Sequence, residues 1–156
     1  MIRTINMDRQ MSPSIFLPVV RELVRSYQAF ELASARHIRE LGLTPPQFDI
    51  IATLGNTSGM NCKELGEKTL ITKGTLTGVL DRLTDKGLIC RSTPPEDRRS
   101  IFICLTPAGE ALFQQAFPAH LQFLENIFGR LQPATLNDLQ TSLQALRQAF
   151  EQEIEA

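Results

Sequence analysis

The clearest structural signal in the chain is the stretch Asp97-Arg98-Arg99-Ser100-Ile101-Phe102-Ile103-Cys104-Leu105-Thr106-Pro107-Ala108-Gly109. Within it, Ile101, Ile103 and Leu105 alternate with Phe102 and Cys104, a pattern that is typical of a half-buried strand. Thr106 followed by Pro107 is the pattern of a helix N-terminus, with a capping residue and a proline in the first turn. We therefore predict a strand that leads directly into a helix, preceded by a turn with Arg98 and Arg99 at its tip.

Two capping patterns lie upstream of this stretch. Thr44 with Gln47, and Asn61 with Glu64, have the spacing of a capping box. The first predicts a helix to about residue 55, followed by a loop over 56–60. The second predicts a short helix to about residue 69.

A further helix is predicted over residues 73–86, capped by Thr72 and ended by Gly87. Its apolar residues share one face and are Leu76, Val79, Leu80 and Leu83. Two short helices so close together suggest a helix-turn-helix. Residues 88–91 are a plausible partner for the strand 101–105, so the hairpin would form a wing. Residues 44–106 are thus predicted to be a winged helix-turn-helix.

Longer helices are predicted on both sides of this unit, over 15–41 and 107–154. Pro118 is expected to kink or break the second of these, and Pro133 to start a final helix. The final helix has a seam of apolar residues spaced by threes and fours: Leu136, Leu139, Leu143, Leu146 and Phe150. These helices offer more apolar surface than a small winged domain can cover, so we predict that they form a dimer interface.

The composition restricts the class of protein. The chain has 156 residues, 42% hydrophobic and 21% charged, which fits one ordinary globular domain over 1–156. No apolar run approaches the roughly 18 residues of a membrane helix, and no signal peptide is recognised. We expect a cytoplasmic protein without a membrane segment. The net charge is −1, yet residues 61–106 hold eight basic and six acidic side chains, so a polyanion would meet the middle of the chain.

Three motifs in this order resemble the MarR (multiple antibiotic resistance regulator) family of winged-helix transcription factors. The segment 97–109 is similar to the family's wing signature, and Leu43-Thr44-Pro45-Pro46-Gln47-Phe48 to the opening of its second helix. The segments 81–83 and 86–89 resemble the end of its recognition helix. The resemblance covers residues 15–150. It implies a mainly α fold with a small β-hairpin wing, in which N- and C-terminal helices dimerise and each winged helix-turn-helix binds DNA.

The resemblance also implies a function and a set of contact residues. The expected function is a sequence-specific, homodimeric repressor that a small organic ligand releases from a pseudo-palindromic operator. The residues expected to face double-stranded DNA are Thr72, Lys73, Gly74, Thr75, Thr77, Gly78, Arg82, Arg98 and Arg99. Asp97 is expected to orient the wing. Arg82 could instead pair with Asp81 or Asp85.

Gly74 and Gly78 depart from the family pattern, which usually has polar or basic residues there. Two glycines inside a helix each cost about 1 kcal/mol relative to alanine. They also remove two side chains from the face that would read DNA. Direct base readout would then rest on few residues, or the helix backbone would approach the groove closely.

A ligand site is implied between the first two helices and the winged domain, with Tyr27, Arg36, His37 and Phe48 as candidates. His37 and His120 lack metal-ligand spacing, so we expect structural histidines, no metal and no cofactor. Cys62 follows a cap, where a thiolate would be stabilised, although a filler role is the simpler interpretation. Cys90 and Cys104 could face each other across the wing and are expected to be free thiols.

Other functions remain as alternatives. The negative net charge and the two glycines give some weight to a winged-helix module for protein contacts. A thiol-based redox-sensing regulator is another alternative, but the family's sensors usually have their cysteine in the first helix, which has none here. No nucleophile–base pair or phosphate loop is recognised, so we predict that the chain is not an enzyme. Neither the ligand nor the operator follows from the sequence.

Overall fold

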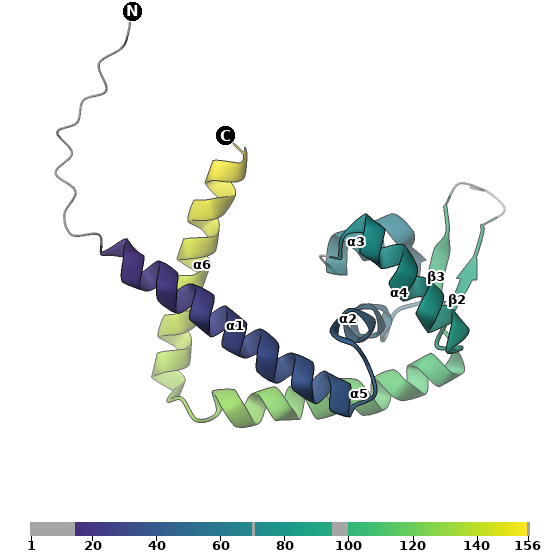
Figure 1. Ribbon diagram of the computed structural model, residues 1–156, viewed down its shortest axis with the longest axis horizontal. Coiled ribbons are helices and arrows are strands. Elements are labelled where there is room, and N and C mark those ends of the chain that lie inside the picture. Colours follow the sequence, from purple (N-terminus) through teal and green to yellow (C-terminus); the bar gives the residue numbers. More distant parts are fainter. Residues whose placement is uncertain (1–14, 70, 95–99, 156) are drawn as a thin grey trace, which may run out of the picture.

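The computed structural model describes residues 15–69, 71–94 and 100–155. The elements follow one another as α1 (Phe16–Glu40), α2 (Pro45–Leu54), β1 (Met60–Asn61), α3 (Cys62–Thr69), α4 (Lys73–Asp85), β2 (Ile89–Ser92), β3 (Phe102–Leu105), α5 (Pro107–Phe128) and α6 (Pro133–Glu155). In Figure 1 the elements α2 to β3 form a compact group at one end of α5, and α6 rises from its other end. The predicted mainly α fold with a small β wing is confirmed.

The hydrophobic core holds the winged group together. The side chains with almost no exposure come from four different elements: Ile50, Ile51, Leu54, Leu65, Leu83 and Ile103. All four apolar residues predicted on one face of α4 are buried, which confirms that prediction. Phe113 and Ala116 of α5 belong to the same core, so the long helix α5 is anchored in the winged group.

Local capping explains where several helices begin. The Thr44 hydroxyl accepts a hydrogen bond from the Gln47 amide, and the Gln47 side chain accepts one from the Thr44 amide. Asn61 and Glu64 form the same reciprocal pair at α3. Thr72 differs from the prediction, because its side chain makes no cap hydrogen bond and donates to the Thr75 hydroxyl at 3.2 Å.

The sheet has three strands in the order β1-β3-β2, both pairs antiparallel. The predicted loop over 56–60 is therefore wrong at its end, where Met60 pairs with Ile103. A two-residue strand has too few positions for an alternating pattern, so only its partner reveals it. Gly59 has a φ of +106°, a conformation that an L side chain rarely adopts, at the turn into β1.

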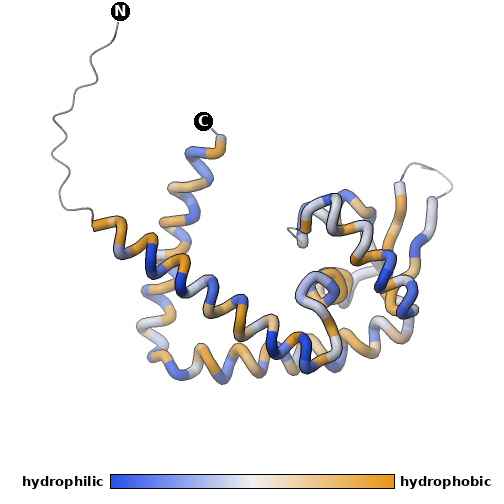
Figure 2. The backbone as a smooth tube through the Cα atoms, viewed as in Figure 1, coloured by the Kyte–Doolittle hydropathy of each residue, from blue (hydrophilic) through white to orange (hydrophobic). Residues whose placement is uncertain are grey.

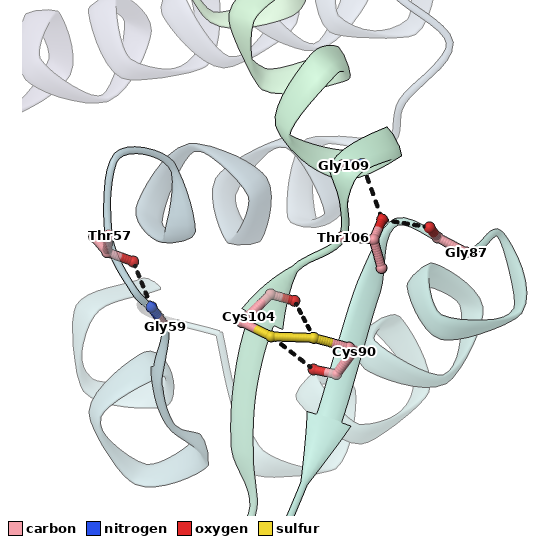
Figure 3. Close-up of a disulfide and its surroundings, with 7 residues drawn as sticks. All are labelled: Thr57, Gly59, Gly87, Cys90, Cys104, Thr106 and Gly109. Atoms are coloured by element: carbon pink, nitrogen blue, oxygen red, sulfur yellow. Dashed lines mark hydrogen bonds between the residues drawn. A yellow bond between two sulfur atoms is a disulfide. The ribbon is translucent and has the colours of Figure 1, made fainter.

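A disulfide joins Cys90 of β2 to Cys104 of β3 (Figure 3). The two residues are directly opposite in the register, with their Cα atoms 5.4 Å apart. The expectation that they face each other is confirmed, and the expectation that both are free thiols is wrong. That expectation came from the reduced state that is usual for cysteines in the cytoplasm. The strand register, however, brings the two sulfur atoms within bonding distance. Cys62 is a free thiol.

The long helices extend beyond the winged group. α5 continues through Pro118 from residue 107 to residue 128, so no break occurs there. Buried Phe113, Ala116 and His120 flank the proline and hold the helix in place on both sides. α1 packs against α2 and α5. Figure 2 shows that hydrophobic and hydrophilic residues alternate along α1 and α6, the helices that extend away from the winged group.

Candidate DNA-binding interface

The polar face of α4 lies opposite its buried face. Thr72, Lys73, Gly74, Thr75, Thr77 and Arg82 are exposed, and Gly78 is half-buried. The helix thus brings together every residue of the predicted DNA-facing set that precedes the wing. Its N-terminal turn presents hydroxyl groups and one ammonium group, which suit phosphate oxygens and base edges.

The two glycines of α4 have different surroundings. A Cβ added at Gly74 would meet no other atom within 4 Å. A Cβ at Gly78 would lie 3.4 Å from the Arg82 guanidinium, because Arg82 Nε donates to the Gly78 carbonyl at 3.1 Å. Arg82 therefore lies back along its own helix.

A short ion pair joins α4 to the wing. Arg91 Nη2 of β2 donates to Asp81 Oδ1 of α4 at 2.7 Å. The Arg91 side chain is 29% exposed, so it is partly shielded from water. Sequence reasoning missed this pair. The available signal was the alternation along β2, which places Arg91 on the same face as buried Ile89 and so toward α4.

The wing residues Asp97, Arg98 and Arg99 lie outside the described residues. Beside the wing, a hollow of about 830 Å³ opens between α3, α4 and the chain entering β3. Lys63, Lys73 and Thr77 line it, together with Cys62 and Ser100. Two ammonium groups and two hydroxyls thus border one concave surface next to the polar face of α4.

A second hollow of about 810 Å³ lies between α1, α2 and α5. Among the four residues suggested for a ligand site, Tyr27 and Phe48 line it, whereas Arg36 and His37 do not. Arg36 forms an exposed ion pair with Glu40 at 3.4 Å. Sequence reasoning missed the lining residues Arg39, Asp49 and His120, because only the packing of α1 on α5 places them together. Burial raises the pKa of the Asp49 carboxyl.

Two histidines connect α1 to α5 beside this hollow. His37 Nδ1 and His120 Nδ1 are 3.0 Å apart, and His120 Nε2 is 3.1 Å from the Ser34 hydroxyl. Phe48 stands edge-on to the His120 ring at 4.9 Å. Burial and the neighbouring His37 lower the pKa of His120. The expected structural role of both histidines fits these contacts.

In the described part of the chain, no helix is long and apolar enough to span a membrane. Residues 43–101 match the model of the MarR family. The transcriptional regulator MhqR of Bacillus subtilis is 30% identical over 109 residues, which cover 70% of this chain and 75% of that protein. The homoprotocatechuate degradative operon repressor of Escherichia coli is 34% identical over 105 residues, 67% of each chain.

A solved structure extends the likeness to the fold. BpsR of Bordetella bronchiseptica, whose DNA binding is regulated by 6-hydroxynicotinic acid, is 29% identical with a TM-score of 0.73, over 83% of this chain and 98% of that one. The winged helix-turn-helix fold and the polar face of α4 fit the family to which these relatives belong. The chain belongs to the MarR family of DNA-binding transcriptional regulators.

Proposed function

We propose that this protein is a homodimeric repressor that binds a pseudo-palindromic operator through α4 and its wing. The observation that carries the proposal is the exposed polar face at the N-terminus of α4, with Thr72, Lys73 and Thr75 opposite a buried apolar face. A helix of this kind fits the major groove, and its N-terminal residues reach base edges. The repressor role is supported by the relative that represses a degradative operon.

The remaining contact residues follow from this placement of α4. Thr77 lies on the same exposed face, and Gly74 and Gly78 let the helix backbone come close to the groove. Arg82 contacts a phosphate after it leaves the Gly78 carbonyl. Arg98 and Arg99 enter the minor groove next to the major groove, where a narrow groove concentrates negative potential. Asp97 orients one of these arginines.

The dimer would form through α1 and α6. Large apolar side chains on both helices are exposed in the single chain: Val20, Val24, Phe30, Leu139, Leu143 and Phe150. Contact of so many apolar groups on α1 and α6 with water is unfavourable, and a second copy of the chain would cover these groups. The chain would then be one functional unit, with 44–106 as the DNA-binding part and 15–41 and 107–154 as the dimerisation helices.

The hollow between α1, α2 and α5 would hold a small aromatic acid as the inducer. Tyr27 and Phe48 offer rings for stacking, and Arg39 and His120 offer donors for a carboxylate or hydroxyl group. BpsR, which responds to 6-hydroxynicotinic acid, supports this ligand class. A ligand there would contact α1, α2 and α5 at once, and so would change how the winged group sits on the dimerisation helices.

The proposal is tested by titrating duplex DNA from upstream of its own gene, and random duplex, at several salt concentrations. Lys73→Ala should weaken binding to both duplexes and reduce the salt slope by about 1. Thr75→Ala should lower the ratio of specific to random affinity and leave the slope unchanged. Arg36→Ala is the matched control on α1 and should change neither quantity. Unaltered affinity in both α4 variants would refute this placement of DNA.

The wing is tested in the same titration. Arg99→Ala should weaken binding to operator and random duplex alike, because a minor-groove or phosphate contact depends on charge more than on sequence. If affinity and salt slope both remain at the wild-type values, the wing does not touch DNA.

A further inference from the structure

The outer face of the wing sheet holds a pair of cysteines. Ile89 and Ile103 point into the core and are buried, so Cys90 and Cys104, their neighbours along each strand, face the opposite side. Both cysteines are half-buried rather than enclosed. Neither cysteine belongs to the hydrophobic core, so the bond between them can form and break without opening the core.

The strand geometry suits this bond without movement of the backbone. The Cα–Cα separation of 5.4 Å lies within the usual range for disulfides. On the other side of β3 the neighbouring residue is Gly59, where an added Cβ would come within 3.0 Å of the Cys104 Cβ. The absence of a side chain there leaves room around Cys104.

The pair lies at the base of the wing. Arg91, the residue after Cys90, holds β2 to α4 through Asp81. The Thr106 hydroxyl donates to the Gly87 carbonyl and so closes the base of the hairpin, as Figure 3 shows. The sequence between the two cysteines includes all of the wing residues proposed to meet DNA. A bond between Cys90 and Cys104 therefore closes the loop that carries Arg98 and Arg99.

We propose that Cys90 and Cys104 form a reversible dithiol–disulfide site, and that its oxidation by a peroxide strengthens the binding of the wing to DNA. One thiolate attacks a peroxide oxygen and breaks the O–O bond, which gives a sulfenic acid and hydroxide. The other thiol then attacks this sulfur and expels its oxygen as water. Two thiols lose two electrons and two protons, and hydrogen peroxide becomes two water molecules. A small-molecule dithiol reverses the step by thiol–disulfide exchange.

The effect on DNA follows from the position of the bond and rests on the proposed role of the wing. The reduced hairpin is held at this level by backbone hydrogen bonds, whereas the oxidised hairpin is also joined covalently. The cross-link removes conformations in which β2 and β3 separate at this level, so less freedom is lost on binding, and the oxidised protein should bind operator about threefold to tenfold more tightly, mainly through slower dissociation. Oxidation would thus strengthen repression, in contrast to the small-molecule inducer.

The experiment compares wild type with Cys62→Ser and with the double variant Cys90→Ser/Cys104→Ser. Each protein is reduced with dithiothreitol or treated with hydrogen peroxide, and its thiols are counted after denaturation. Oxidised wild type should keep one thiol, that of Cys62, and oxidised Cys62→Ser should keep none. Peptide mapping should join residue 90 to residue 104. Oxidised wild type should also unfold at a higher temperature than the reduced form, because the cross-link restricts the unfolded chain.

Operator binding supplies the second measurement. The gain in affinity on oxidation should appear in wild type and in Cys62→Ser, and should be absent from the double variant. Three remaining thiols, a bond that involves Cys62, or a covalent dimer would overturn the site. Equal affinity of the two redox forms would overturn the effect on the wing. If neither form binds operator or random duplex, the DNA-binding proposal fails, while the thiol count still decides the dithiol site.

Discussion

Single residues on α4 decide what this protein can present to DNA. Arg82 lies along its own helix because its Nε donates to the Gly78 carbonyl, and a Cβ added at Gly78 would lie 3.4 Å from its guanidinium. Gly74, one turn earlier, leaves open space beside the helix. The face that would read DNA therefore has few long side chains, and presents hydroxyl groups and backbone atoms instead.

Gly74→Ala should raise the free energy of unfolding by about 0.5–1 kcal/mol. A methyl group fits into the open space, and alanine loses less conformational freedom than glycine in a helix. Urea denaturation measures the change, with Gly66→Ala in α3 as the matched control for helix propensity. A less stable Gly74→Ala protein would contradict this prediction. Weaker operator binding by a more stable variant would indicate that the backbone at Gly74 approaches the groove.

Asp81 and Arg91 should show a small but measurable coupling. The pair is close but partly exposed, with Asp81 57% accessible, so solvent screens the attraction. A double-mutant cycle with Asp81→Ala and Arg91→Ala, followed by thermal unfolding, should give about 0.2–1 kcal/mol. Arg82→Ala is the control, since Arg82 makes no ion pair with Asp81. Strict additivity of the two substitutions would show that the pair does not stabilise the wing.

Contacts between elements control how the winged group is attached to the rest of the chain. α5 has its first half in the hydrophobic core and its second half against α1. His120 lies at the transition, and contacts Ser34 and His37 of α1. Any change in the charge of this buried ring acts on the junction of α1 and α5.

Acid should weaken the folded state through His120. Burial and His37 lower the pKa of His120 in the folded chain, so the unfolded chain, with a pKa near 6.5, takes up the proton first. The contribution of His120 to stability is therefore constant above about pH 7 and falls as the pH drops below about 6.5. His120→Gln should show a smaller decrease between about pH 7 and pH 5 in urea midpoints. A wild-type midpoint that does not change across this interval would contradict the lowered pKa.

The whole molecule has an uneven distribution of apolar surface. The winged group buries most of its large apolar residues, with Ile101 as an exposed exception, whereas α1 and α6 expose many of theirs, including Phe150 at 56% and Ile154 at 83%. Such surfaces in a water-exposed helix favour association. We therefore expect assembly to depend on α1 and α6, separately from the stability of the winged core.

The substitutions Leu139→Glu and Leu143→Glu together should shift the protein from dimer to monomer and weaken operator binding in parallel. Each places a carboxylate on the seam of α6, where an apolar partner surface would remove it from water. Sedimentation velocity at micromolar concentration measures the change. Gln144→Glu and Gln148→Glu together, at two exposed positions of the same helix, are the charge-matched control. A folded wild-type monomer under these conditions would refute the dimer.

A two-fold dimer should protect two half-sites in operator DNA. Two copies of α4 related by symmetry reach successive major grooves on one side of the duplex, about 10 base pairs from centre to centre. Footprinting should therefore find a pseudo-palindrome with this spacing. Protection of one asymmetric half-site would contradict the symmetric assembly.

Local sequence was enough to predict the helices of this protein and the two strands of the hairpin. The capping pairs Thr44–Gln47 and Asn61–Glu64, the apolar face of α4 and the Thr106-Pro107 start of α5 all depend on neighbours within a few residues. The order of those elements was then enough to indicate the winged helix-turn-helix and the family. The candidate DNA-facing residues of α4 were also available, because helical periodicity alone separates a polar from an apolar face.

Contacts between elements far apart in sequence depend on how the whole chain packs. The strand β1 exists because β3 offers it a partner, and the Cys90–Cys104 bond exists because the register places these two residues opposite each other. The Asp81–Arg91 pair and the contact of His37 with His120 likewise depend on how one element packs on another. Local sequence specifies which way a side chain points from its own element, whereas the distance to a remote partner follows from packing of the whole chain.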